Sequence, residues 1–201
     1  MPKVFHLCPV CESLVDIRND HVYCKNCGEI FIYSKEYKVW ENPKILDISY
    51  IDPRSTVLST MFPHSFSLDT IYGKKTFNSF EAFLLTLCWP GTDVGIYDEL
   101  ARLSRIDAHR VQLGLFNEWK KSQKVTWNKR KISRDSEEYH ALLRMAFDKL
   151  FEQSHLFRMG LISSGNKILL HSAGEDDHRK TLLTREEYIS NLNRQRDKLK
   201  M

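Results

Sequence analysis

The sequence contains no apolar run long enough to cross a bilayer. Its longest largely apolar stretch, Phe83 to Trp89, falls far short of the ~20 residues that a membrane-spanning helix needs. The first residues, Met1-Pro-Lys3, are not followed by the apolar region of a secretory signal peptide. We therefore expect a soluble, cytoplasmic protein without a membrane partner.

Internal repeats and low-complexity tracts are also missing, and so is a strong excess of one charge. The net charge of +4 permits contact with nucleic acid or phosphates but is too small to identify such a partner. Basic residues cluster only locally, between Lys120 and Lys131, where a solvated face is the simplest interpretation. With 42% hydrophobic and 28% charged residues, the 201-residue chain is typical of an ordered protein with one substantial core.

Cysteine is scarce, but its placement is informative. Four of the five cysteines form two pairs, Cys8-Pro-Val-Cys11 and Cys24-Lys-Asn-Cys27, with twelve residues between them. This spacing lets four thiolates converge on one structural Zn²⁺, so it predicts a zinc ribbon that owes most of its folding free energy to the metal. A redox dithiol is disfavoured because no βαβ pattern flanks either pair. Thiols spaced for a metal also fit a reducing compartment.

We expect the chain to divide into three parts. Residues 1–40 should form the zinc ribbon, because short segments of this part alternate apolar and polar residues as strands do, at 14–17, 21–23 and 30–33. Residues 41–54 contain two prolines and predict an extended connector that either links two units or lies along the second. Residues 55–201 should form an α+β domain that is mostly helical.

Helical periodicity is clearest just after the start of this third part. Phe80, Phe83, Leu84 and Leu87 predict a helix over 79–88 with one buried stripe. Glu81 lies off that stripe, near the start of the helix. Two further short helices are expected to follow, over 93–105 and 107–114.

Helix-start signals recur in the second half of the chain. Asp135-x-x-Glu138 and Thr184-x-x-Glu187 each predict a capping box before a longer helix. Between these helices, residues 167–171 predict a short strand that runs into the polar turn 172–177.

Three features have the chemistry of a sugar-binding pocket. Glu81 is an acid beside apolar residues, Trp119 and Trp127 flank the basic stretch, and Asp176 and Asp177 follow a histidine in a glycine-containing turn. One carboxylate can stabilise an oxocarbenium-like centre, another can activate water, and an indole can stack on a base. Taken alone these residues have simpler explanations, as a first-turn helix acid, core tryptophans and turn formers.

Short motifs in a consistent order strengthen the case. Leu58-Ser59-Thr60-Met61-Phe62-Pro63-x-x-Phe66, followed by Ser79-x-Glu81-x-Phe83, resembles the opening signature of the NADAR (YbiA-like) family. Members of that family commonly show L-S-N-F-x-P-x-x-F and S-x-E-x-[FYH]. The resemblance extends over about residues 58–199, and one of its segments resembles phage-encoded relatives, which would place the protein in a host cytoplasm. The later matches are Ala108 to Gly114, Asn117-Glu118-Trp119, Trp127 to Tyr139, Leu169-x-His171-Ser172-x-Gly174 and Thr181 to Tyr188.

The resemblance implies a domain that binds ADP-ribose or a ribosylamine compound and hydrolyses its N-glycosidic bond. The substrate would be ADP-ribosylated guanine in nucleic acid or an intermediate of riboflavin synthesis. Carried over to this sequence, Glu81 is the catalytic carboxylate, Trp119 the stacking aromatic, and Asp177 or Asp176 the second carboxylate. The residues expected to contact substrate are Ser59, Phe62, Trp127, Arg134, His171, Ser172 and Gly174.

One departure from the family pattern separates two functions. Many relatives carry a lysine seven residues after the motif glutamate, where an amine can open the sugar as a Schiff base, but this chain has Cys88 there. A thiol cannot form an imine, so a lysine-dependent route would need Lys74, Lys75 or another amine instead. We expect Cys88 to be a buried, protonated core residue. The chain is then either an N-glycosidase that uses its carboxylates directly, or a catalytically silent adaptor that binds ADP-ribose or nucleic acid.

Overall fold

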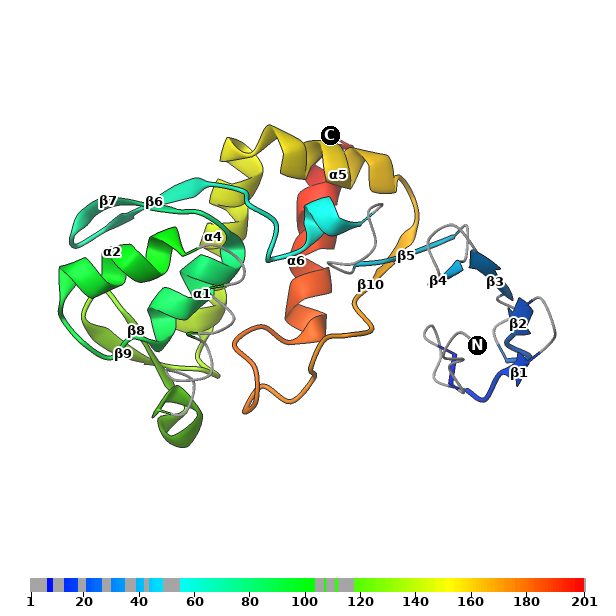
Figure 1. The fold of residues 1–201 in the computed structure, drawn as a ribbon, viewed down its shortest axis with the longest axis horizontal. Coiled ribbons are helices and arrows are strands. Elements are labelled where there is room, and N and C mark those ends of the chain that lie inside the picture. Colours follow the sequence, from blue (N-terminus) through cyan, green and yellow to red (C-terminus); the bar gives the residue numbers. More distant parts are fainter. Residues whose placement is uncertain are drawn as a thin grey trace.

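The computed structural model of the chain describes residues 7–8, 13–17, 21–26, 30–34, 39–41, 44–48, 55–103, 107, 111 and 118–200. Figure 1 shows that strands β1 to β4 lie at one end of the molecule, away from the helices. The helix predicted over 107–114 lies outside the described residues, except that residues 107 and 111 are helical. Cys11 and Cys27 of the predicted zinc site lie outside them as well.

The first sheet is an antiparallel meander in which neighbours in the chain pair with each other. The strands predicted at 14–17, 21–23 and 30–33 are confirmed, with small shifts of their ends. Three buried side chains of this part, Cys8, Val22 and Cys24, form a cluster together with Ile45 of the next strand along the chain. The strands are β1 (Asp16–Ile17), β2 (His21–Tyr23), β3 (Ile30–Ser34) and β4 (Val39–Glu41).

The predicted connector contains a strand that belongs to the rest of the chain. β5 (Ile45–Asp47) pairs in parallel with β10 (Ile168–Leu170), the strand predicted at 167–171. Leu46 and Leu169 face each other in this pair and both belong to the main hydrophobic core. The described part of the connector therefore lies along the second unit, which was one of the two expected arrangements.

Two β-hairpins complete the strands. In the first, β6 (Phe66–Thr70) and β7 (Gly73–Phe77) pair so that Phe66 faces Phe77, and Gly73 takes a φ of +85° in the turn. In the second, β8 (Lys124–Trp127) pairs with β9 (Arg130–Ser133). Each hairpin turns one apolar face toward the helices and leaves the other face polar.

The helices begin close to the predicted positions. α1 (Phe80–Cys88) and α2 (Val94–Arg102) confirm the two helices expected there, with the cap residues Ser79 and Asp93 accepting hydrogen bonds from backbone N–H groups. The expectation of a single buried stripe on the first is wrong, because all nine residues of α1 are buried, including Glu81. The remaining helices are η1 (Thr56–Leu58), α4 (Glu137–Gln153), α5 (His155–Ser164) and α6 (Arg185–Lys198).

One of the two predicted capping boxes is present. At α6, the Thr184 side chain accepts from the Glu187 N–H and the Glu187 carboxylate accepts from the Thr184 N–H, as expected. At α4, Ser136 and not Asp135 is the cap residue, and its hydroxyl accepts from the Tyr139 N–H at 3.2 Å. The helix therefore starts one residue later than the capping-box pattern predicts.

Helix α1 lies at the centre of the core. Phe80 and Phe83 on α1 contact the ring of Phe66 from β6, and Phe80 also contacts Phe147 of α4 at 4.1 Å between ring centres. Burying each such ring contributes about 1.5–3 kcal/mol. Because α1 is enclosed on all sides, a polar side chain on it needs partners or a cavity. The overall fold is mixed α+β, and helices account for more of the described residues than strands do.

Candidate functional site

Glu81 lies at the wall of a cavity of about 290 Å³. Although it belongs to the buried helix α1, its side chain is 8% exposed and reaches this space. We call the space the Glu81 cavity. Its wall is largely apolar with a few polar groups, which is the usual composition of a small-molecule site. The lining residues are Thr60, Met61, Glu81, Leu84, Leu85, His171, Ala173, Gly174, Glu175, Thr181, Leu182, Leu183 and Tyr188.

Thr60 holds Glu81 in place by two contacts. The Thr60 hydroxyl donates to Oε2 of Glu81 at 3.2 Å, and the Thr60 carbonyl accepts from the Glu81 N–H at 2.9 Å. The second bond satisfies one of the backbone N–H groups that a helix leaves open in its first turn. The segment after η1 and the start of α1 are thereby joined at the carboxylate.

The turn after β10 supplies a second wall. His171 Nδ1 lies 2.7 Å from the carbonyl oxygen of Ile48, which can only accept, so the proton is on Nδ1 and Nε2 remains an acceptor in the neutral ring. Gly174 donates its N–H to the His171 carbonyl, and a Cβ at Gly174 would lie only 2.7 Å from the His171 ring. This close approach requires glycine. The turn predicted to bind substrate therefore reaches the cavity through His171 and Gly174.

Tyr188 of α6 lies at the floor of the cavity. Its hydroxyl donates a short hydrogen bond to the carbonyl of Leu58, and its ring packs edge-on against His171. Burial raises the pKa of Tyr188 well above its usual range, and the negative charge of Glu81 raises it further. Tyr188 is consequently a neutral group that holds the cavity wall in place. The sequence pattern does not indicate this role, because it predicts only a core residue of a helix.

Three acidic residues follow Gly174 in this turn. Glu175 lines the cavity, whereas Asp176 and Asp177 do not. Glu175 accepts hydrogen bonds from the N–H groups of Asp177 and Asp176, which lower the pKa of its carboxyl. Asp177 is held by the guanidinium of Arg179, which lowers its pKa strongly. Asp176 forms an ion pair with Arg185 at 3.1 Å. The sequence motif located the correct turn, but three adjacent acids gave no signal to choose among them.

The tryptophans lie elsewhere. Trp119 is 1% exposed and belongs to the main core, so it does not line the Glu81 cavity. Trp127, at the end of β8, is half-buried and packs edge-on against Phe83. The structure therefore brings together Glu81, His171 and Gly174 but does not place Trp119, Asp176 or Asp177 at the same cavity.

Three other predicted contacts serve the local framework. Ser59 caps η1 and its hydroxyl accepts from the Met61 N–H at 3.3 Å, while Phe62 packs on the ring of His64. Ser172 donates its N–H to Asp47 at 2.9 Å, next to the β5–β10 pair. These residues adjoin the cavity wall in sequence without lining the cavity themselves.

Comparison with known proteins identifies the family and the fold of the chain. The family described as bacteriophage protein GP30.3 matches residues 53–197, well over half of the chain. The chain belongs to this GP30.3 family. Its structure is similar to the NMR structure of the E. coli protein YbiA, with a TM-score of 0.50 and 17% sequence identity, over 78% of this chain and 85% of YbiA. The predicted YbiA-like fold is confirmed. No curated protein matches the chain.

The match to the GP30.3 family begins at residue 53, so it excludes the amino-terminal part of the chain that contains β1 to β5. Within that part, Cys8 and Cys24 are buried in one cluster. The structure shows no group of three or more metal-binding side chains among the described residues, which omit Cys11 and Cys27. Nor does any described helix have the length and hydropathy of a membrane span.

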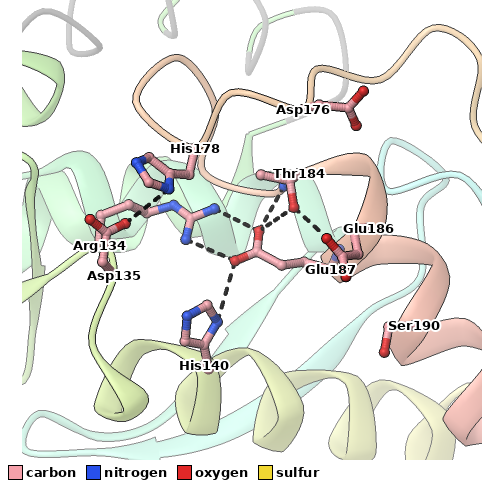
Figure 2. Close-up of a pocket in the computed structure, with 9 residues that line it drawn as sticks. All are labelled: Arg134, Asp135, His140, Asp176, His178, Thr184, Glu186, Glu187 and Ser190. Carbon is pink, nitrogen blue, oxygen red and sulfur yellow. Dashed lines mark hydrogen bonds and ion pairs between the residues drawn. The ribbon is translucent and has the colours of Figure 1, made fainter.

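A second hollow of about 570 Å³ in this GP30.3 family member lies between α4 and α6 (Figure 2). Arg134 lies at its base, where two parallel hydrogen bonds of 2.8 and 2.6 Å join its guanidinium to Glu187. Arg134 was expected to contact substrate, but its side chain is 1% exposed and its Nε donates to the carbonyl of Thr181. Its donors are thus engaged within the protein.

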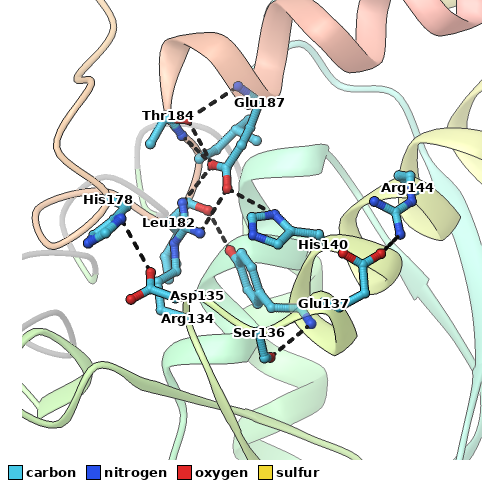
Figure 3. Close-up of polar contacts among 12 residues, drawn as sticks. Arg134, Asp135, Ser136, Glu137, His140, Arg144, His178, Leu182, Thr184 and Glu187 are labelled. Carbon is cyan, nitrogen blue, oxygen red and sulfur yellow. Dashed lines mark hydrogen bonds and ion pairs between the residues drawn. The ribbon is translucent and has the colours of Figure 1, made fainter.

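Figure 3 shows how Glu187 connects several elements. Burial opposes the ionisation of Glu187, but hydrogen bonds from Arg134 and Thr184 outweigh it and hold the pKa of this carboxyl below its usual value. His140 of α4 lies 3.3 Å from the same carboxylate. The guanidinium also stacks 4.5 Å from the ring centre of Tyr139. This network fastens the end of β9, α4 and α6 to each other.

Cys88, at the position where the NADAR resemblance leads one to expect a lysine, lies at the end of α1. Its thiol is 2% exposed, and burial raises the pKa of Cys88 far above its usual value, with a further contribution from the charge of Glu81. The thiol is therefore protonated and cannot act as a nucleophile at neutral pH. This agrees with the expectation of a core cysteine.

Proposed function

We propose that this GP30.3 family member is an N-glycosidase that hydrolyses an ADP-ribosyl or ribosylamine compound in the Glu81 cavity. The observation that carries the proposal is the Glu81 carboxylate, fixed by Thr60 at the wall of an otherwise largely apolar cavity. The motif resemblance to NADAR proteins and the fold shared with YbiA support it. We include both ADP-ribosylated guanine in nucleic acid and a riboflavin-pathway intermediate as substrates to be tested.

The expected chemistry is direct hydrolysis. As the bond between the anomeric carbon and nitrogen breaks, its electron pair leaves with the nitrogen and positive charge develops on the sugar. Water then bonds to the anomeric carbon, and the proton that it releases goes to the departing nitrogen. A fixed carboxylate in a site of low dielectric stabilises the positive charge on the sugar. We assign this role to Glu81 and the orientation of the attacking water to Glu175, because Glu175 lines the cavity and Asp176 and Asp177 do not. The thiol at position 88 is buried and cannot form an imine, so the proposed mechanism contains no Schiff-base intermediate.

Replacing Glu81 tests the assignment. We expect Glu81→Gln to lower turnover by about 10²-fold or more, the loss typical of removing one general acid–base group. Purified chain is incubated with ADP-ribosylated guanine nucleic acid and with ribosylaminopyrimidine phosphates, and released sugar is measured by mass spectrometry. Glu152→Gln, an exposed glutamate on α4, is the matched control and should retain full activity. Equal activity of the wild type and Glu81→Gln would remove Glu81 from the mechanism.

A second candidate is an adaptor that binds ADP-ribose or nucleic acid without turnover. The specific observation in its favour is the buried Cys88 at the lysine position. Tight binding of one of the same compounds by the wild type, with no released product from any of them, would favour this function. Binding that weakens steeply with salt would further point to nucleic acid.

We also propose that Cys8, Cys11, Cys24 and Cys27 hold one structural Zn²⁺. The spacing of the two cysteine pairs and the burial of Cys8 and Cys24 in one cluster support this site. Elemental analysis should find one zinc per chain, and Cys24→Ser should lose it. A chelator should remove a separate low-temperature unfolding step and leave the main transition in place. Cys88→Ala is the control and should keep the metal; a metal-free wild type would exclude the site.

A further inference from the structure

One segment concentrates the positive charge of the chain. Residues 118–133 contain six of its 30 basic residues and one of its 26 acidic residues, Glu118. Their formal charge is therefore +5 in a chain whose total is +4, so the rest of the chain is close to neutral. The segment folds as a short helix over 118–122 followed by the β8–β9 hairpin, at the opposite end of the molecule from β1 to β4 (Figure 1).

The hairpin turns its apolar residues inward and its lysines outward. Val125 and Ile132 face each other in the pairing and are buried. Because side chains alternate between the two faces of a strand, Lys124 and Lys131 lie on the opposite face, as diagonal neighbours on adjacent strands. Both are exposed. A diagonal pair of this kind is separated by roughly 7–8 Å, so the two long lysine side chains can reach the same anionic partner.

The turn of the hairpin is held in an unusual way. Asn128 and Lys129 have φ angles of +49° and +64°, the two-residue turn in which glycine normally follows asparagine. Lysine is disfavoured at such a backbone angle. Asn128 accepts a hydrogen bond from the N–H of Ile71 at 3.0 Å, and the ammonium of Lys129 lies 5.3 Å from the ring centre of Tyr72. The tips of the two hairpins are thus joined, and Lys129 is presented at the junction.

The charge of this surface is largely uncompensated. Arg130 forms an ion pair with Glu138 at 3.0 Å. In the described part of the chain, Lys121, Lys124 and Lys131 form no ion pair, and all three are exposed. We call Lys121, Lys124, Lys129 and Lys131 the basic ribbon. Like charges held this close repel one another, so an anionic partner would relieve the repulsion.

We propose that the basic ribbon binds the phosphate backbone of nucleic acid. A two-stranded ribbon with lysines on one face matches the size of a nucleic-acid groove, and lysine recognises phosphate as a point charge. An anionic membrane fits less well, because the apolar side chains Val125 and Ile132 of the β8–β9 hairpin are buried and cannot insert into lipid. One consequence rests on the proposed glycosidase function: a surface that binds nucleic acid favours a substrate carried by nucleic acid over a free nucleotide.

Fluorescence anisotropy with a labelled 20-base-pair duplex and a 20-nucleotide single strand tests the surface without any need for turnover. We expect the wild type to bind at low salt and to lose affinity steeply as salt rises. Lys124→Gln with Lys131→Gln should weaken binding about 10-fold or more at low salt and reduce the slope of log affinity against log salt by about 2. Binding is read by anisotropy and turnover by sugar release, so failure of this inference is distinguishable from failure of the glycosidase.

Two further variants make the result decisive. The double variant Lys149→Gln and Lys200→Gln also removes two positive charges, one from α4 and one from just after α6. It should leave nucleic-acid binding nearly unchanged. Lys129→Gly suits the positive φ, so it should keep or raise the melting temperature while weakening binding. An equal loss in the Lys149/Lys200 control, no binding by the wild type, or binding to phosphatidylserine vesicles but not to nucleic acid would each overturn the proposal.

Discussion

Arg134 and Glu187 illustrate how a single residue pair can hold distant parts of the chain together. The carboxylate of Glu187 serves three partners, since it pairs with Arg134, caps α6 through Thr184 and contacts His140. The pair is largely removed from water, with side-chain exposures of 1% for Arg134 and 15% for Glu187. A buried charge that loses its partner retains its desolvation penalty without the compensating attraction.

We therefore expect Arg134→Met to destabilise the protein by about 3–5 kcal/mol, because it leaves the Glu187 carboxylate buried and unpaired. Urea unfolding followed by circular dichroism measures the change. Arg144→Met, which breaks the exposed pair with Glu137, is the matched control and should leave the unfolding midpoint nearly unchanged. If both variants unfolded at the same urea concentration, the Arg134 pair would not have the structural role that its geometry indicates.

Residue identity alone could not predict this pairing. Arg134 was interpreted as a substrate contact because a cation near a resemblance motif suits a diphosphate, whereas its partner is 53 positions away in the chain. Glu81 was predicted as a site residue from its motif, and the structure places it at a cavity. Glu175 gives no such signal, because three consecutive acids follow Gly174 and only the geometry of the turn determines which one lines the cavity.

At the scale of elements, local signals placed the helices well but not always their first residue. Asp135 and Ser136 are both good cap residues, and the pattern of Asp135 with Glu138 favoured the earlier one. In the structure Ser136 accepts the N–H of Tyr139, while Asp135 lies 3.3 Å from His178. The backbone of α4 has to begin where β9 ends, a constraint that the capping pattern does not contain.

Cap substitutions separate the two assignments. Ser136→Ala should destabilise the protein by about 1 kcal/mol, because it leaves a backbone N–H of the first turn without its acceptor. Asp135→Ala should cost clearly less, since the Asp135 side chain accepts from none of the described backbone N–H groups at the start of α4. Thermal unfolding of the two variants gives the order directly. A larger loss for Asp135→Ala would restore the capping box that the sequence predicted.

Hairpins were harder to predict than helices. The β8–β9 turn uses Asn128-Lys129 where Asn-Gly is the usual signal, so the sequence marks the segment as basic more strongly than as a turn. The β6–β7 hairpin has a turn glycine, Gly73, but its second strand, Gly73-Lys74-Lys75-Thr76-Phe77, does not alternate clearly between apolar and polar residues. Helices with capping residues and a 3.6-residue period carry their own local evidence, whereas hairpin strands of only four or five residues carry little.

Across the whole molecule, contacts between remote segments decide the arrangement. β5 comes from the predicted connector and pairs with β10, more than a hundred residues later, and this parallel pair carries His171 to the cavity. No periodicity within either strand predicts such a partner. The resemblance to NADAR proteins predicted the YbiA-like fold, but it begins near residue 58 and therefore did not include β5 or its pairing with β10.

His64 should make the stability of the folded protein depend on pH. The Val57 carbonyl can only accept, so His64 Nε2 donates to it at 2.6 Å, and the neutral Nδ1 accepts from Ser154, the cap residue of α5, at 2.8 Å. Burial lowers the pKa of His64 below its ordinary value of 6.5, and the bond to Val57 offsets this only in part. The folded protein therefore takes up a proton at His64 less readily than the unfolded chain.

Stability should consequently fall as pH decreases below about 6.5, because the unfolded state then binds a proton that the folded state resists. Above that pH the contribution of His64 is complete. Glu187 and Asp148, whose pKa values are lowered, act only near and below their ordinary values of 4.5 and 3.8. Urea unfolding between pH 8 and 5.5 isolates the histidine window. His64→Gln should be less stable at pH 8 but should lose less stability on acidification; parallel curves for the two proteins would show that His64 is not the group responsible.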